Sequence, residues 1–140
     1  MTTTGVELVE RAGKAYALIL RHSATSTEKY NFLTDSQGPL QLGMNFYKQG
    51  ETIKAHYHLP RRIETNQVQE FLLIGAGRAT LTLFDADDQS PFTTLQLETG
   101  DMVLLLSGGH GLQIQEDTKI VEIKQGPYDG KSKDKVVFGT

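Results

Sequence analysis

Cysteine is absent from this 140-residue sequence, and so is any long apolar run. Without cysteine the chain has no disulfide, thiolate nucleophile, zinc ribbon or iron–sulfur cluster. A bound metal would therefore be held by His, Asp or Glu. The longest apolar run, Met102 to Leu106, has the length of a strand and is far shorter than the roughly 18 residues of a membrane helix.

A strong charge of either sign is also lacking, because 14 basic and 17 acidic residues give a formal net charge of −3. This balance argues against binding to nucleic acid through phosphate contacts and against a polybasic membrane anchor. The first residues lack the basic and apolar stretches of a secretory signal peptide. We expect a cytoplasmic, globular, single-domain protein with no nucleic-acid or membrane partner.

Fourteen glycines are scattered along the chain and separate short segments that alternate or run apolar. This punctuation is typical of an all-β fold, a sandwich or a closed barrel. Helical periodicity does not persist, although residues 23–31 could form one short helical turn. The expected strands are Val6–Glu10, Ala15–Arg21, Leu40–Tyr47, Thr52–His58, Val68–Ile74, Arg78–Phe84, Thr93–Leu97, Met102–Leu105, Gly111–Gln115 and Lys119–Gln125.

Three of the four histidines occur in a pattern that suggests metal binding. His56 and His58 are two residues apart on an expected strand, so both side chains point to one face, about 7 Å apart. Glu70 lies in the strand that follows, and His110 comes after a Gly-Gly pair. Imidazole and carboxylate groups are ligands for divalent transition metals. A His-x-His pair also occurs by chance on solvated strands, and His22 has no partner at ligand spacing.

These residues resemble the two signature motifs of the cupin superfamily. The chain reads Gly50-x5-His56-Tyr57-His58, then Glu70-x6-Gly77, then Gly100-x9-His110. The resemblance implies a double-stranded β-helix, a jelly-roll-like barrel of two antiparallel sheets, over residues 40–125. It also implies one divalent transition metal (Fe, Zn, Mn or Ni) in the mouth of the barrel, with His56, His58, Glu70 and His110 as its ligands.

The chain departs from the cupin signature in three places. Eleven residues separate His58 from Glu70, where the signature has three or four, so Glu64 is a rival carboxylate ligand. We favour Glu70 because it keeps the spacing to Gly77 and opens a strand. Leu106-Ser107 stands where the signature has Pro, and Ile114 stands where it has Asn.

Two further stretches are similar to a group of small single-domain cupins with no assigned reaction. They are Gly108 to Gly111 and Glu122 to Tyr128, and members of that group are often associated with carbohydrate or polysaccharide metabolism. The resemblance implies a homodimer in which strands of residues 1–39, Val6–Glu10 and Ala15–Arg21, are candidates for exchange. The segment 126–140 is either a frayed tail or a clasp that docks on the domain.

The residues around the expected metal site suggest how a small molecule would be handled. Glu122 and Lys124 share one face of a strand and are either solvated or line the pocket. The first functional hypothesis is a metal-dependent isomerase, epimerase or lyase acting on a small polar, carbohydrate-related molecule. The alternatives are a metal-dependent dioxygenase and a non-catalytic small-molecule or sugar-binding module. The candidate acid–base residues are Glu122, Lys124 and Tyr57, and the candidate substrate-binding residues are Arg62, Gln69 and Phe46.

Overall fold

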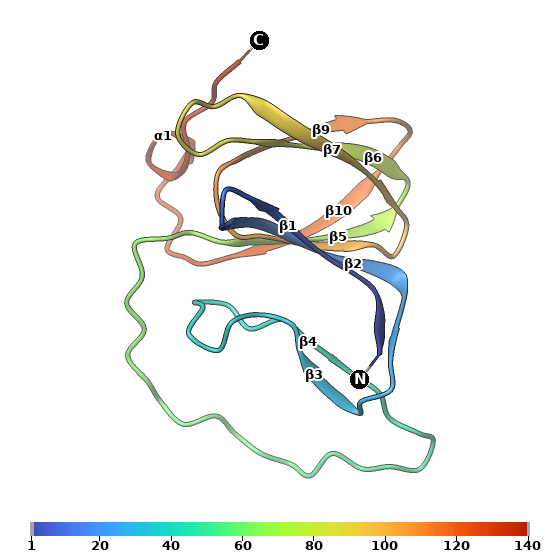
Figure 1. The fold of residues 1–140 in the computed structure, drawn as a ribbon. Helices are drawn as coiled ribbons and strands as arrows, with labels where there is room; N and C mark the ends of the chain where they lie inside the picture. The colour runs from blue at the N-terminus through green and yellow to red at the C-terminus, as the bar shows by residue number, and fades with distance from the viewer. Residues whose placement is uncertain (1, 140) are drawn as a thin grey trace.

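The structure is a computed structural model that describes residues 2–139. Within these residues, ten strands and one short helix are present, and the strands form three antiparallel sheets (Figure 1). The elements are β1 (Thr3–Arg11), β2 (Lys14–Ser26), β3 (Tyr30–Phe32), β4 (Gly43–Asn45), β5 (Glu70–Ala76), β6 (Arg78–Phe84), β7 (Pro91–Glu98), β8 (Met102–Leu105), β9 (Gly109–Ile114), β10 (Lys119–Lys124) and α1 (Lys131–Asp134).

Two of the sheets face each other and enclose the hydrophobic core. The five-stranded sheet has the order β1-β2-β8-β5-β10, and the three-stranded sheet has the order β7-β6-β9. Figure 1 shows the three-stranded sheet above the five-stranded sheet, with the β3–β4 hairpin on the far side of the latter. Leu72 and Ile74 of β5 pack in the same core cluster as Leu81 and Leu83 of β6. Burying each such side chain contributes about 1.5–3 kcal/mol to folding.

The central strands of the five-stranded sheet are apolar on both faces, because both faces are covered. Val103 of β8 is fully buried against the three-stranded sheet, and Leu104 next to it is only 1% exposed on the opposite face. Leu40 and Leu42 lie near Leu104 on that outer side. Strands covered on both faces read as continuous apolar runs, which explains the unbroken apolar run of β8.

Most of the predicted strands are confirmed. Arg78–Phe84 and Met102–Leu105 have the predicted bounds, and the strands predicted near residues 6, 15, 68, 93, 111 and 119 exist with shifted ends. Leu40–Tyr47 was too long, since only Gly43–Asn45 is a strand. Residues 23–31, which could have formed a short helical turn, contain no helix, because β2 continues to Ser26 and pairs with β1 there.

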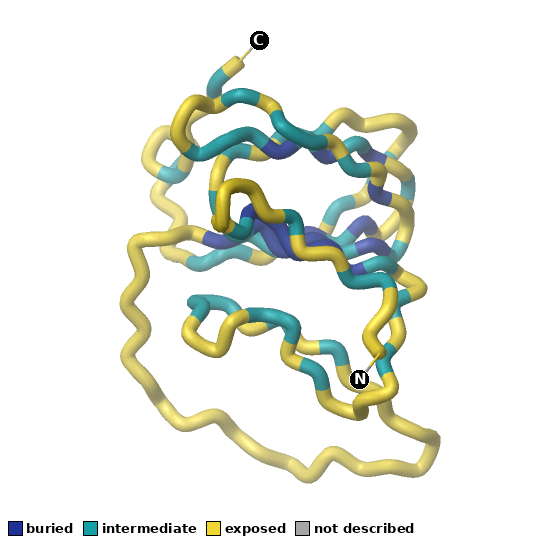
Figure 2. The backbone as a smooth tube through the Cα atoms, in the orientation of Figure 1, coloured by how far each residue is buried: buried dark blue, intermediate teal, exposed yellow. Residues whose placement is uncertain are grey.

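The predicted strand Thr52–His58 is wrong. Between β4 and β5 the described chain forms no helix or strand, and residues 46–68 are all exposed. Figure 2 shows this segment as a long exposed loop that runs beside the domain. Its alternation of polar and apolar side chains has the period of a strand, but a strand needs a neighbour to pair with, and none lies beside it among the described residues.

The β-rich fold class is confirmed at the level of an antiparallel β domain. The described strands form separate sheets of five, two and three strands, and no closed barrel is found among them. The strands expected as exchange candidates, β1 and β2, form a hairpin within their own chain. No helix within residues 2–139 is long and apolar enough to cross a membrane.

Candidate functional site

Glu70 and His110 meet at one end of the space between the two large sheets. Glu70 is on β5 and shares its inward face with the buried Leu72 and Ile74. His110 is on β9 and lies opposite the buried Leu83 of β6, so it points inward from the other sheet. Their side chains approach to 3.0 Å between His110 Nε2 and Glu70 Oε2.

The Glu70 carboxylate is strongly favoured in its ionised form. A hydrogen bond with the His110 imidazole lowers the pKa of Glu70 to about 2, although burial alone would raise it. The nearby positive charge of Lys124 lowers this pKa further. Glu70 therefore presents an anionic oxygen donor at neutral pH, which is the form that a metal ligand or an ion-pair partner requires.

Lys124 and Glu122 also point into the space between the sheets. The register of β10 on β5 places Lys124 opposite Glu70 and Glu122 opposite Leu72, and such cross-strand partners point to the same face. Val121 and Ile123 point outward and are exposed. Of the two side chains, Lys124 lines the pocket described below, whereas Glu122 is 45% exposed and is not among its lining residues.

Lys124 has two carboxylate partners. Its Nζ lies 2.9 Å from Asp134 Oδ2 and 3.5 Å from Glu122 Oε1. The hydrogen bond to Asp134 raises the pKa of Lys124, with a smaller contribution from Glu122. The ammonium form is therefore favoured, and this suits Lys124 better to binding an anion than to accepting a proton.

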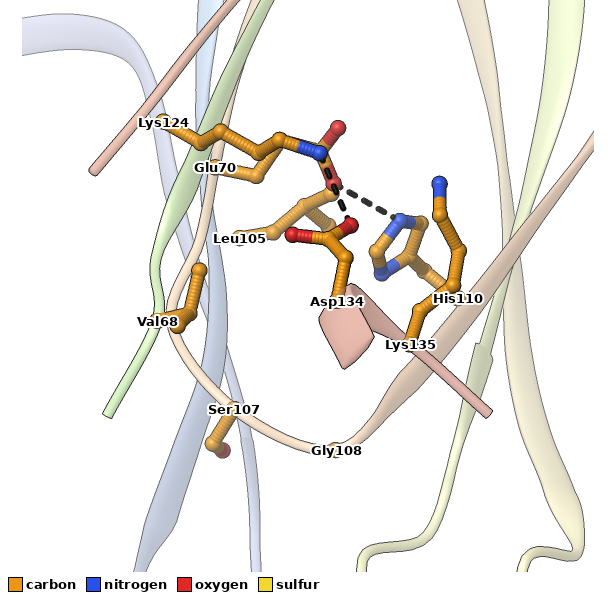
Figure 3. Close-up of a pocket in the computed structure, with 9 residues that line it drawn as sticks. All are labelled: Val68, Glu70, Leu105, Ser107, Gly108, His110, Lys124, Asp134 and Lys135. Carbon is orange, nitrogen blue, oxygen red and sulfur yellow. Dashed lines mark hydrogen bonds and ion pairs between the residues drawn. The ribbon is translucent and has the colours of Figure 1, made fainter. Parts of the chain in front are cut away.

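These groups border a small pocket of about 180 Å³. Figure 3 shows Glu70 and His110 joined across it, with the Lys124–Asp134 ion pair alongside. Asp134 comes from α1 in the C-terminal segment, which closes the pocket. The lining residues are Val68, Glu70, Leu105, Ser107, Gly108, His110, Lys124, Asp134 and Lys135.

His56 and His58 lie outside this pocket. Both are exposed on the loop of residues 46–68, with their ring centroids 5.4 Å apart. His56 Nδ1 lies 2.8 Å from the Lys54 carbonyl oxygen. The four predicted ligands therefore form two separate pairs, and no group of three or more potential ligands occurs together within the described chain.

The other predicted site residues are spread over the molecule. Tyr57 is 84% exposed on the same loop, and Phe46 is partly exposed at its start. Arg62 is exposed and pairs only weakly with Glu64, at 3.4 Å. Gln69 is buried just before β5, where its N–H donates to the Gln125 side chain at 2.8 Å. None of these four side chains borders the pocket of Glu70 and His110.

Three polar pocket residues were not predicted from the sequence: Ser107, Asp134 and Lys135. Ser107 follows β8 and donates to the Ala15 carbonyl oxygen at 2.6 Å. Asp134 and Lys135 lie in a polar stretch of mixed charge that has no hydrophobic periodicity. The sequence held one signal that this end of the chain docks on the domain, the apolar patch Val136 to Phe138 that follows a polar connection.

Comparison with protein-family models, curated protein sequences and solved structures finds no match to this chain.

Proposed function

We propose that this protein is a small metal-binding cupin that acts as a metal-dependent isomerase, epimerase or lyase on a small polar, carbohydrate-related molecule. The proposed ligands are His56, His58, Glu70 and His110. The observation that carries the proposal is the meeting of Glu70 and His110 from two facing sheets at the edge of a pocket. These two residues are 40 positions apart in the sequence, yet both predicted ligands point to one place.

The Glu70 and His110 donor atoms fit a shared metal ion. Transition-metal bonds to histidine nitrogen and carboxylate oxygen are about 2.0–2.2 Å long. Two donor atoms that lie 3.0 Å apart can therefore both bind the same ion. The carboxylate is anionic, as metal ligation requires. The other half of the ligand set does not reach this point in the structure, so the proposal requires the loop of residues 46–68 to move.

The free edge of β9 offers a place for this loop. β9 pairs with β6 on one side, and within residues 2–139 its other edge has no strand partner. A strand formed by residues 52–58 and added to that edge would lie next to His110. The eleven residues between His58 and Glu70 can span about 36 Å when extended, so this connection permits the approach.

A metal at this site would polarise a substrate carbonyl or hydroxyl and stabilise enolate-like negative charge. The protein's own groups would position the substrate. The Lys124 ammonium points into the pocket and can hold a negatively charged or hydroxylated group. Glu122, 3.5 Å from Lys124 Nζ, is the nearest carboxylate on the same strand and is the candidate proton acceptor.

A non-catalytic binding module is the second candidate function. It is favoured by the small volume of the pocket and by the pairing of Lys124 with two carboxylates, which holds it in the protonated form. A binding module would keep the pocket and its charges without turnover. The remaining alternative is a metal-dependent dioxygenase. The identity of the bound metal distinguishes it from an isomerase, epimerase or lyase, because bound iron would favour dioxygen chemistry.

The proposal is tested by measuring the metal content of the purified, untagged protein by elemental mass spectrometry. We expect about one transition-metal ion per chain, and we expect its loss in the His56→Ala/His58→Ala variant and in Glu70→Gln. His22→Ala is the matched control, because His22 lies outside the proposed ligand set and its side chain is 60% exposed. An absence of metal from the wild-type protein, even after reconstitution, would overturn the proposal.

A further inference from the structure

The C-terminal segment, residues 126–139, closes the pocket and is held there by very few side chains. All of its residues are exposed except Gly130, Asp134 and Phe138. Asp134 forms the ion pair with Lys124, and the Phe138 ring packs edge-on against Phe84 with 5.2 Å between ring centroids. Together with Tyr128, whose ring centroid lies 5.1 Å from Lys124 Nζ, these two side chains provide most of the attachment of this segment.

The hydrogen bonds of the segment show the same weak attachment. The backbone N–H groups of Lys133 and Asp134 donate to Gly130, and that of Lys135 donates to Lys131, so these bonds stay inside the segment. Among the described residues, its one hydrogen bond to the rest of the protein comes from Lys124 to Asp134. Segments with few buried contacts separate from a domain at low free-energy cost.

Lys124 needs an anionic partner where it lies. Its side chain is 20% exposed and points between the sheets, and a charge removed from water is costly unless it is paired. Glu122 is farther away, at 3.5 Å, while Asp134 is at 2.9 Å. The closest partner of Lys124 is therefore the one that belongs to the detachable segment.

We propose that Lys124 binds a carboxylate group of the protein's small-molecule ligand, and that the Asp134 carboxylate occupies this position until the ligand displaces it. The inference rests on the proposed function only in taking this pocket as the ligand site, and it does not depend on the metal. The Glu70 carboxylate lines the pocket, and the Glu122 carboxylate lies 3.5 Å from Lys124 Nζ, so both repel anions. An incoming carboxylate is thus favoured only at the position where Asp134 already offsets the charge of Lys124.

The neighbouring surface has room for the rest of a ligand. A larger hollow of about 580 Å³ also has His110 in its lining and is bordered by Phe84, Asp85 and Val136 to Phe138. The C-terminal segment lines both this hollow and the smaller pocket, so both become more open when the segment detaches. The site therefore suits a small, anionic molecule that extends from Lys124 past His110.

The test uses malonate as the probe and its uncharged diamide, malonamide, as the matched control. Binding is measured by calorimetry at low salt on protein that was freed of metal and dialysed, so that malonate cannot bind through a metal ion. Asp134→Asn removes the competing charge and keeps the side-chain shape. We expect it to bind malonate roughly fivefold to tenfold more tightly than the wild type. Adding Lys124→Met to Asp134→Asn should abolish binding.

Asp129→Asn is the control for the change in net charge, because Asp129 is exposed in the same segment. The inference is wrong if Asp134→Asn binds malonate no better than Asp129→Asn, or if malonamide binds as well as malonate. A second measurement uses the unaltered protein. Saturating malonate should move the backbone amide NMR signals of residues 131–138 toward the chemical shifts of a disordered chain. Unchanged chemical shifts would also overturn the inference.

The two proposals fail in different ways. If the protein binds no metal but Asp134→Asn gains malonate affinity, the metal-dependent function fails and the carboxylate site stands. If metal binds with the expected ligands but malonate affinity is the same in all variants, the metal site stands and this inference fails.

Discussion

Asp101 is the carboxylate that the fold buries most completely. It is 2% exposed and accepts hydrogen bonds from the backbone N–H groups of His22 and Glu98, both at 3.0 Å. The Arg21 guanidinium adds a third bond, at 2.9 Å. One side chain thus connects β2 to the turn between β7 and β8, and its negative charge strengthens all three bonds.

Replacing Asp101 by Asn should destabilise the domain by about 3 kcal/mol at pH 7, because the buried donors lose an anionic acceptor. Burial alone would raise the pKa of Asp101, but the three hydrogen bonds outweigh it and lower the pKa. Protonation on acidification thus costs stability that is fully present above the unfolded-state pKa of about 3.9. Urea unfolding between pH 7 and pH 3 should show a weaker acid dependence in Asp101→Asn.

Asp117→Asn serves as the control for this prediction, because Asp117 is exposed and the change in formal charge is the same. If Asp101→Asn and Asp117→Asn unfold at the same urea concentration at pH 7, the buried carboxylate does not hold these elements together.

The turn between β5 and β6 contains a glycine, Gly77, that the backbone requires. Gly77 has φ +92°, and an added Cβ would lie 2.5 Å from the Asp117 carbonyl oxygen and against the Thr118 hydroxyl. Gly77→Ala should lower the free energy of unfolding by at least about 2 kcal/mol through backbone strain and this clash.

Gly75 lies two residues before Gly77, near the end of β5, and provides its matched control. Its nearest neighbour would be the Lys119 side chain, at an ordinary contact distance of 3.5 Å. Gly75→Ala should change the free energy of unfolding by less than about 0.5 kcal/mol. Equal effects of the two substitutions in urea unfolding would show that the turn does not depend on a positive φ.

A protease should cut the loop of residues 46–68 before it cuts any of the paired strands. Every residue in it is exposed, and it forms no strand or helix among the described residues. Brief trypsin digestion of metal-free protein should therefore cleave at Lys48, Lys54, Arg61 or Arg62, while Arg78 and Lys119 in paired strands resist. Mass spectrometry of the fragments identifies the sites, and early cleavage at Arg78 would contradict the prediction.

Strands with a clear hydrophobic pattern between turn residues were predictable from the sequence. β6 alternates buried and partly exposed residues, and β8 is a short apolar run between turn residues, so both were found with correct bounds. Thr52–His58 has an equally regular alternation, but the sequence says nothing of whether a neighbouring strand is present. The strand was therefore predicted and is not formed.

The site was predictable only in part, for a related reason. The spacing of Glu70 to Gly77 and of Gly100 to His110 singled out two residues that do meet. The Lys124–Asp134 pair crosses from β10 to α1, and no periodicity or motif connects the two positions. Contacts between an element and an irregular segment depend on how that segment docks, which local sequence patterns do not encode.

At the scale of the whole molecule, the polar and apolar faces of the five-stranded sheet are divided in an unusual way. Toward the pocket end, β10 turns Glu122 and Lys124 inward and leaves Val121 and Ile123 exposed on the outside. Soluble sheets commonly have the opposite arrangement, with the polar side chains outside. The inward polar face is what the proposed ligand site at this end of the space between the sheets requires.

The proposed metal site would couple the exposed loop to the stability of the entire domain. A metal that binds only the folded protein adds about 2.7 kcal/mol at a hundredfold excess over its Kd. For a domain of this size, that corresponds to a rise in Tm of roughly 10 °C. The His56→Ala/His58→Ala variant should match the wild-type Tm without metal, because both side chains are exposed, but it should lose most of this rise. His22→Ala should keep the rise, and an equal rise in the double variant would exclude His56 and His58 as ligands.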